Sequence, residues 1–77
     1  MIRVYGKPSC VQCDATKRDL DKRGLEYEYR SLLDEPSDRI EAWKTEGHMS
    51  APIVVTPTET WSGYRPDRIK NLVNQAA

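Results

Sequence analysis

The chain has 77 residues and carries 12 lysines and arginines against 12 aspartates and glutamates, so its formal net charge is zero. This length predicts one domain over residues 1–77, and the mixing of both charge signs leaves no basic stripe for nucleic acid. The longest apolar run, Ile53 to Val55, is too short to span a bilayer, and strand residues rather than a signal peptide follow Met1. We therefore expect a soluble, cytoplasmic monomer that binds neither nucleic acid nor a membrane.

The first predicted element is a strand over Ile2–Tyr5, which Gly6 ends. Its lack of apolar and polar alternation suits a central strand that is covered on both faces. A loop then leads to a predicted helix over Val11–Arg23, with Gly24 as its stop. The segment Cys10-Val11-Gln12-Cys13 lies where this helix begins, and it holds the only two cysteines of the chain.

The placement of Cys10 and Cys13 predicts a thiol and disulfide redox site. Residues three apart on a helix are neighbours, so the two sulfurs can form a disulfide with little backbone movement. Unpaired backbone N–H groups at a helix start favour a thiolate over a thiol. Cys13 shares a helix face with Leu20, whereas Cys10 is at the outer tip. This geometry predicts Cys10 as the attacking thiol and Cys13 as the buried resolving thiol.

Other readings of the two cysteines fit the sequence less well. Structural zinc needs four ligands, and the chain offers two cysteines and the lone His48, so we expect no metal and assign His48 no role. A structural disulfide across two intervening residues would restrain the unfolded chain little. Packing of both cysteines as small hydrophobic side chains conflicts with the polar approach at residues 7–9 and with Gln12 between them.

The next predicted strand covers Leu25–Arg30. Its apolar and charged residues alternate at a period of two, which is typical of a half-exposed strand at a sheet edge. Tyr27 and Tyr29 are then expected to face inward. In a reducing compartment a C-x-x-C pair beside such a sheet is more often catalytic than structural.

Residues 34–37 carry a helix-start signal, with acids and a proline in the first turn. The predicted helix runs to about Glu46. Ile40 and Trp43 are at helical spacing and supply its apolar stripe, so we expect Trp43 to pack in or near the core.

The last third of the chain predicts a hairpin and a helix. Pro52 opens a strand that continues through Thr56, Pro57-Thr58 turns the chain, and Glu59–Trp61 returns. Pro66 begins a final helix. Its apolar stripe consists of Ile69, Leu72 and Val73.

These elements follow the order βαβαββα, which predicts an α/β fold. A right-handed crossover makes the first two strands parallel neighbours. The hairpin completes a four-stranded mixed sheet that is flanked by helices.

Three segments together resemble a known family. They are Cys10–Cys13 followed by Ala15-Thr16-Lys17, Ala51-Pro52 before the third strand, and Trp61-Ser62-Gly63-Tyr64-Arg65-Pro66-Asp67 before the last helix. In this order, over nearly the whole chain, they resemble the NrdH-type redoxins. Those proteins have the thioredoxin fold and the size of glutaredoxins but behave as thioredoxins.

The resemblance implies a small electron carrier, a thiol-disulfide oxidoreductase without a bound cofactor. Its expected partners are a class Ib ribonucleotide reductase, which it would supply, and NADPH-dependent thioredoxin reductase, which would reduce it. The resemblance also implies a cis peptide bond before Pro52 and a segment after Trp61 that braces the active-site loop. The expected substrate- and partner-binding residues are Ala51, Pro52, Trp61, Ser62, Gly63, Tyr64 and Arg65.

Two alternatives remain beside this carrier. Typical glutaredoxins carry C-P-Y-C, T-V-P and a glycine pair that holds the glutathione carboxylate, where this chain has Val11-Gln12, Ser50-Ala51-Pro52 and Ser62-Gly63. Because of these differences, a glutathione-dependent glutaredoxin is the second hypothesis, after the thioredoxin-like carrier. The third is an interaction module that uses the thioredoxin fold without redox turnover.

Overall fold

The computed structural model describes residues 1–76, with the side chains of residues 1–73. The elements in chain order are β1 (Ile2–Gly6), α1 (Val11–Lys22), β2 (Tyr27–Ser31), a 3-10 helix η1 (Leu32–Asp34), α2 (Ser37–Thr45), β3 (Ile53–Val55), β4 (Thr60–Ser62) and α3 (Pro66–Ala76). Apart from η1, this is the predicted order βαβαββα. Among residues 1–76, no helix has the length and apolar character needed to cross a membrane.

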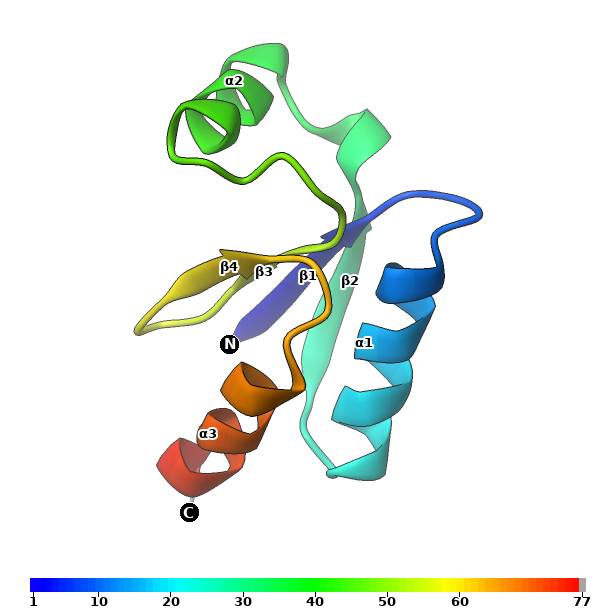
Figure 1. Cartoon of the computed structure of the whole chain (residues 1–77), viewed down its shortest axis with the longest axis vertical. Coiled ribbons are helices and arrows are strands. Elements are labelled where there is room, and N and C mark those ends of the chain that lie inside the picture. The colour runs from blue at the N-terminus through cyan, green and yellow to red at the C-terminus, as the bar shows by residue number, and fades with distance from the viewer. Residues whose placement is uncertain (77) are drawn as a thin grey trace.

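The four strands form one mixed sheet in the order β2-β1-β3-β4 (Figure 1). β1 runs parallel to β2, with Val4 opposite Tyr29. β3 is antiparallel to β1, with Val54 opposite Val4, and β4 is antiparallel to β3. The predicted parallel pair, the hairpin and the edge position of β2 are all confirmed.

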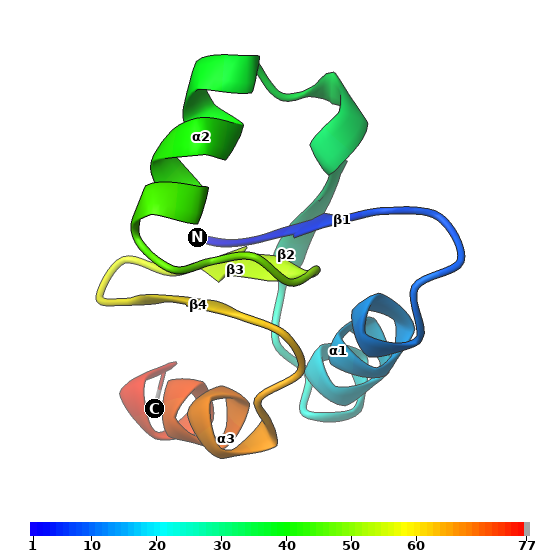
Figure 2. The same ribbon diagram turned by 45° about the horizontal axis from the view of Figure 1, so that its top comes forward.

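Helices cover both faces of the sheet, and Figure 2 shows α2 on one side with α1 and α3 on the other. Adjacent residues of β1 serve the two cores, which confirms that this strand is covered on both faces. The larger core lies towards α1 and α3 and contains Val4, Leu20, Val54, Trp61, Ile69 and Leu72. The smaller core lies towards α2 and contains Tyr5, Trp43 and Ile53. Trp43 therefore packs in the core as predicted, with its ring centroid 4.9 Å from that of Tyr5.

Several element ends differ from the prediction by one or two residues. β3 is shorter than expected because Thr56 closes the turn rather than extending the strand, while β4 has the expected length but begins one residue later. The Thr56 hydroxyl donates to the Glu59 carbonyl and accepts from the Glu59 nitrogen. The short η1 helix was not predicted, and the Ser31 hydroxyl caps it by accepting a hydrogen bond from Leu33.

The expectation that Tyr27 and Tyr29 both face inward is only partly confirmed. Tyr27 packs against the larger core, whereas Tyr29 keeps 38% of its surface exposed. Tyr29 lies on the edge strand, where the ammonium of Lys17 stands 4.2 Å from its ring centroid. A flexible lysine therefore covers this ring in place of a packed core.

Candidate active site

Cys10 is the N-cap residue of α1. Its backbone is extended, with φ −116° and ψ 109°, and its sulfur accepts a hydrogen bond from the Cys13 nitrogen over 3.2 Å. The Cys10 side chain is partly exposed. A cysteine at this position meets the unpaired N–H groups and the positive end of the helix dipole. The arrangement provides what an attacking thiol requires, which is access to solvent and backbone donors beside the sulfur.

Cys13 lies one helical turn further on and is fully buried. Burial raises its pKa to about 11, and the Cys10 side chain adds to this, while the backbone of Lys7 and the side chain of Tyr29 act against it. Both cysteines are free thiols in this structure. The sequence therefore predicts correctly that Cys10 is at the tip and that Cys13 is inside. At neutral pH Cys13 is therefore a buried, protonated thiol beside Cys10.

The segment before β3 lies against Cys10. The Ala51–Pro52 peptide bond is cis, as the resemblance implies, and Pro52 is buried. The Cys10 thiol donates to the Ala51 carbonyl oxygen over 3.8 Å. A main-chain group from a residue 41 positions away in the sequence is thus placed beside the exposed sulfur.

The loop after β4 is connected both to this segment and to α1. The Gly63 nitrogen donates to the Pro52 carbonyl over 2.8 Å. The Tyr64 nitrogen donates to Oε1 of Gln12 over 2.9 Å. Gln12 lies between the two cysteines. The loop after β4 is therefore hydrogen-bonded both to the segment that contains the cysteine pair and to the proline segment beside Cys10.

Two features of this loop explain its shape. Gly63 has φ +80°, a conformation that favours glycine, and a Cβ there would lie 3.0 Å from Gln12 Oε1. The Tyr64 hydroxyl donates to Oδ2 of Asp19 over 2.8 Å, and Oδ1 of Asp19 is 2.6 Å from Nε of Arg23. The loop is therefore fixed along two turns of α1.

The predicted binding residues fall into two groups. Ala51, Ser62 and Tyr64 are half-buried and Arg65 is exposed, while Pro52 and Gly63 contribute their backbone from buried positions. Trp61 requires a correction, because it is only 3% exposed and belongs to the larger core. Its side chain faces α1 and α3, as that of Val54 opposite it in the sheet does. Trp61 therefore packs in the core at the start of the loop after β4 and does not present its ring to a partner.

No sequence pattern indicated the part played by Gln12. Its contact joins positions 52 residues apart, and no local periodicity reports such a pair. Ser9 is a second unpredicted feature, because it has φ +54°, in the left-handed region that non-glycine residues rarely adopt. The strained residue immediately precedes Cys10 and turns the chain into the N-cap position.

A hollow of about 360 Å³ opens at Cys10. It is lined by Lys7, Cys10, Val11, Gln12, Met49, Ser50 and Ala51. Val11 and Met49 are each 79% exposed, so two apolar side chains flank the thiol. Exposed apolar side chains beside a reactive group are typical of a surface that meets a partner.

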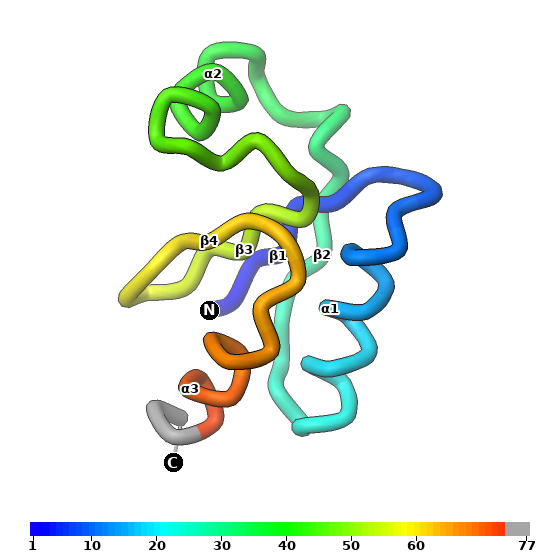
Figure 3. The backbone as a smooth tube through the Cα atoms, viewed as in Figure 1, coloured from blue at the N-terminus to red at the C-terminus, as the bar shows by residue number. Residues whose placement is uncertain are grey.

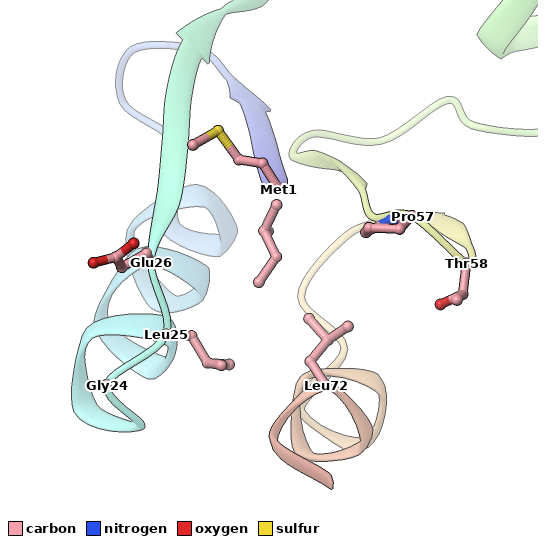
Figure 4. Close-up of a pocket in the computed structure, with 8 residues that line it drawn as sticks. Met1, Gly24, Leu25, Glu26, Pro57, Thr58 and Leu72 are labelled. Carbon is pink, nitrogen blue, oxygen red and sulfur yellow. The ribbon is translucent and has the colours of Figure 1, made fainter. Parts of the chain in front are cut away.

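A larger cavity of about 600 Å³ lies elsewhere, and Figure 4 shows Met1, Leu25 and Leu72 around it. None of its lining residues is a cysteine, a histidine or a lysine. Three of its lining residues, Gly24, Leu25 and Glu26, belong to the connection from α1 to β2, which Figure 3 shows at the C-terminal end of α1. Cys10 is the N-cap residue at the other end of that helix. The redox chemistry therefore belongs to the hollow at Cys10. Within the described part of the chain, no three His, Cys, Asp or Glu residues gather as a metal site.

Comparison with known proteins agrees with this geometry. The glutaredoxin family profile matches residues 2–60. The glutaredoxin-like protein NrdH of Escherichia coli is 38% identical over 71 residues, which is 92% of this chain and 86% of that protein. NrdH of Lactococcus lactis subsp. lactis is 28% identical over 72 residues, covering 94% of this chain and 99% of the relative.

A solved structure shows the same fold. The NrdH-redoxin of Escherichia coli superposes with a TM-score of 0.80 at 38% identity, and the match covers 92% of each chain. That protein is described as glutaredoxin-like with a thioredoxin-like activity profile.

Proposed function

This chain belongs to the glutaredoxin family and is a thiol-disulfide oxidoreductase, and we propose that it is a cytoplasmic electron carrier of the thioredoxin-like kind. In this proposal NADPH-dependent thioredoxin reductase reduces it, and it delivers two electrons to a class Ib ribonucleotide reductase. The observation that carries the proposal is the pairing of an exposed N-cap thiol, Cys10, with the buried thiol of Cys13 one turn away.

The reaction has two steps. The Cys10 thiolate attacks one sulfur of the substrate disulfide, a new Cys10–substrate disulfide forms, and the other substrate sulfur leaves as a thiolate. Cys13 then loses its proton to solvent and attacks the Cys10 sulfur, which releases the second substrate thiolate. The substrate gains two electrons, and a Cys10–Cys13 disulfide remains for the reductase to reduce.

The hollow at Cys10 supports docking of an extended peptide. The Ala51 carbonyl lies beside the thiol, and backbone groups at such a position pair with an incoming strand. The exposed side chains of Val11 and Met49, which line the same hollow as Cys10, provide apolar contacts for such a peptide. We infer that the tail of the ribonucleotide reductase, which would carry the substrate disulfide, binds in this way.

The loop contacts favour a thioredoxin-like carrier over a glutathione-dependent one. A glutaredoxin needs free donors in this loop to hold the glutathione carboxylate. Here the Gly63 nitrogen donates to the Pro52 carbonyl and the Tyr64 nitrogen donates to Gln12. The backbone donor of Gly63, within the Ser62-Gly63 stretch that replaces the glycine pair, and that of the next residue, Tyr64, are therefore engaged within the protein.

A paired reductase assay tests the proposal. NADPH is supplied with thioredoxin reductase in one arm and with glutathione and glutathione reductase in the other, and reduction of a disulfide substrate is followed. We expect turnover in the first arm and little in the second. The inverse result would establish the glutaredoxin reading. Partner function retained after both cysteines are changed to serine would establish the non-redox module instead.

A supply assay then tests the second partner. Class Ib ribonucleotide reductase is given thioredoxin reductase and NADPH, with and without the carrier, and deoxyribonucleotide formation is measured. We expect product only when the carrier is present. The Cys10→Ser variant is the matched control, because it keeps the rest of the docking surface but lacks the attacking sulfur.

A further inference from the structure

Three hollows adjoin one another around Cys10, and Lys7 lines all of them. The first is the hollow of about 360 Å³ that Cys10 itself lines. A second, of about 290 Å³, shares Lys7, Met49, Ser50 and Ala51 with the first and extends along η1 and α2. A third, also of about 290 Å³, shares Lys7 and extends to α1 and β2. We call the residues that line these three hollows the redox face.

The charged side chains of the redox face are mainly basic. Lys7, Lys17 and Lys44 belong to it, together with a single acid, Asp14. The imidazole of His48 lines the second hollow as well and carries no negative charge. Because the whole chain has 12 basic and 12 acidic residues, the excess of positive charge on this face is local.

Two of the three lysines are not engaged by groups of the protein. Oδ1 of Asp14 is 3.7 Å from the ammonium of Lys17, which also stands 4.2 Å from the ring centroid of Tyr29. Among residues 1–73, by contrast, neither Lys7 nor Lys44 forms an ion pair or a cation-π contact. Both side chains are exposed. Their ammonium groups are therefore available to carboxylates of a partner.

We propose that the partner segment that carries the substrate disulfide is acidic, and that its carboxylates bind Lys7 and Lys44 while its disulfide lies at Cys10. This inference rests on the carrier function proposed above and names the chemistry of its substrate. Opposite charges across an interface speed association and set the register of the partner, and both effects weaken as salt is added. The lysines also offset the repulsion between an acidic segment and the Cys10 thiolate.

Other features of the redox face favour a polypeptide over a free anion. The Ala51 carbonyl lies beside the thiol, where it can accept from the backbone of an extended segment. Val11 and Met49 are exposed apolar side chains in the hollow at Cys10. An extended chain rises about 3.3 Å per residue, so acids within a few residues of the partner's cysteine can reach the adjoining hollow.

Oxidised peptides with different flanking charges test the proposal. Each peptide holds one disulfide between two cysteines, flanked on both sides by glutamates, by glutamines or by lysines. Reduced protein is mixed with each peptide, the reaction is quenched in acid, and chromatography of the reduced and oxidised peptide gives the rate constant. Dithiothreitol reduces the same peptides in parallel. The ratio of the two rate constants then removes the effect of the flanking charge on the disulfide itself.

We expect this ratio to be about tenfold higher for the glutamate peptide than for the glutamine peptide at low salt, or about threefold for each exposed ion pair. The lysine peptide should have the lowest ratio. At 1 M NaCl, where the screening length is about 3 Å, the preference should disappear. Lys7→Gln and Lys44→Gln should each lower the preference about threefold, and the double variant should abolish it.

Lys22→Gln is the matched control, because it removes the same charge from an exposed position in the last turn of α1, at the end away from Cys10. It should keep the full preference. Equal ratios for the glutamate and glutamine peptides would overturn the inference and leave the carrier function intact, since both peptides are still reduced. An equal loss of preference in Lys22→Gln and Lys44→Gln would also overturn it. Failure of the unsubstituted protein to reduce any of the three peptides would overturn the carrier proposal and this inference with it.

Discussion

The side-chain oxygen of Gln12 accepts a hydrogen bond from the backbone nitrogen of Tyr64 over 2.9 Å. This contact joins the residue between the two cysteines to the loop after β4. Because the neighbouring Gly63 nitrogen donates to the Pro52 carbonyl, one loop orients both the helix start and the proline segment. The geometry around Cys10 therefore depends on a loop that contains no reacting atom.

Gly63→Ala should loosen this connection. The residue has φ +80°, and a Cβ would press against Gln12 Oε1 at 3.0 Å. We expect a loss of about 2 kcal/mol in the free energy of unfolding, of which about 1 kcal/mol is the backbone penalty alone. Urea unfolding measures the loss, and disulfide exchange by Cys10 should slow in the folded variant.

Gly24→Ala is the control for that variant. Gly24 has φ +70°, but nothing lies within 4 Å of the position its Cβ would take. It should cost only the backbone penalty of about 1 kcal/mol and leave disulfide exchange unchanged. If the two alanine variants lose equal stability, the contact with Gln12 does not constrain the loop.

The pair of Asp19 and Tyr64 should make stability depend on pH in the acid range. Burial pushes the pKa of Asp19 upward, but hydrogen bonds from Arg23 and Tyr64 outweigh it and hold that pKa below its ordinary value. A lowered carboxyl pKa stabilises the fold above the unfolded value near 3.8, and this contribution is lost as the pH falls through the folded value.

Tyr64→Phe removes one of these hydrogen bonds and keeps the ring. We expect it to lower the free energy of unfolding near neutral pH and to have a smaller effect in acid, where Asp19 is protonated. Unfolding of the single variants Tyr64→Phe and Asp19→Asn and of the double variant gives the coupling energy. Additive effects in that cycle would show that the two side chains do not interact.

Cys13 should produce a pH dependence in the alkaline range. Burial raises its pKa from 9.0 in the unfolded chain to about 11 in the folded one. The folded state therefore keeps a proton that the unfolded state has lost, so this stabilisation is full below pH 9 and is lost as the pH rises towards 11. We expect a loss on the order of 1–2 kcal/mol for the reduced protein.

Cys13→Ser separates this effect from other alkaline titrations, including those of the tyrosines. Both proteins are unfolded with urea under reducing conditions over the same pH series. The difference between their stabilities should shrink as the pH rises. A constant difference would mean that Cys13 titrates alike in both states.

The exposed apolar side chains beside Cys10 should affect docking and not stability. Val11→Ser and Met49→Ser change residues that are each 79% exposed, so unfolding should shift by less than about 0.5 kcal/mol. In the assay with ribonucleotide reductase, the proposed electron acceptor, we expect the KM for this protein to rise several-fold with kcat little changed, as loss of uniform binding implies. Leu33→Ser is the control, because Leu33 is 78% exposed but does not line the hollow at Cys10. An equal rise in KM for Leu33→Ser would remove the special role of the two flanking residues.

The sequence predicted the framework of the site because local signals encode it. Helix-start and helix-stop residues are recognised from their immediate neighbours in the sequence. They placed the cysteine pair at a helix start, the end of that helix before Gly24 and the beginning of the last helix at Pro66. Residue patterns indicated the strands, and the crossover and hairpin rules predicted that β1 and β2 are parallel neighbours and that β3 pairs with β4, but not that β3 lies beside β1.

What the sequence did not predict depends on contacts between distant segments. Gln12 looks like a polar spacer until the fold brings Tyr64 against it. Trp61 belongs to a motif expected at the surface, but its place in β4 turns its side chain into the core. Alternation placed Tyr29 inward, yet no local pattern could show that Gly6 would leave room for its hydroxyl.

The most direct test of the two-thiol mechanism is to locate the sulfur that holds the substrate. Reduced Cys13→Ser protein is mixed with a protein disulfide, the reaction is quenched in acid, and intact and peptide masses are measured, with Cys10→Ser treated in parallel. The account predicts that Cys13→Ser accumulates one substrate adduct on Cys10, because the resolving thiol is missing. It also predicts that Cys10→Ser forms no adduct, since Cys13 is buried and protonated. Adducts formed equally well on Cys13 would contradict the assignment of the two roles.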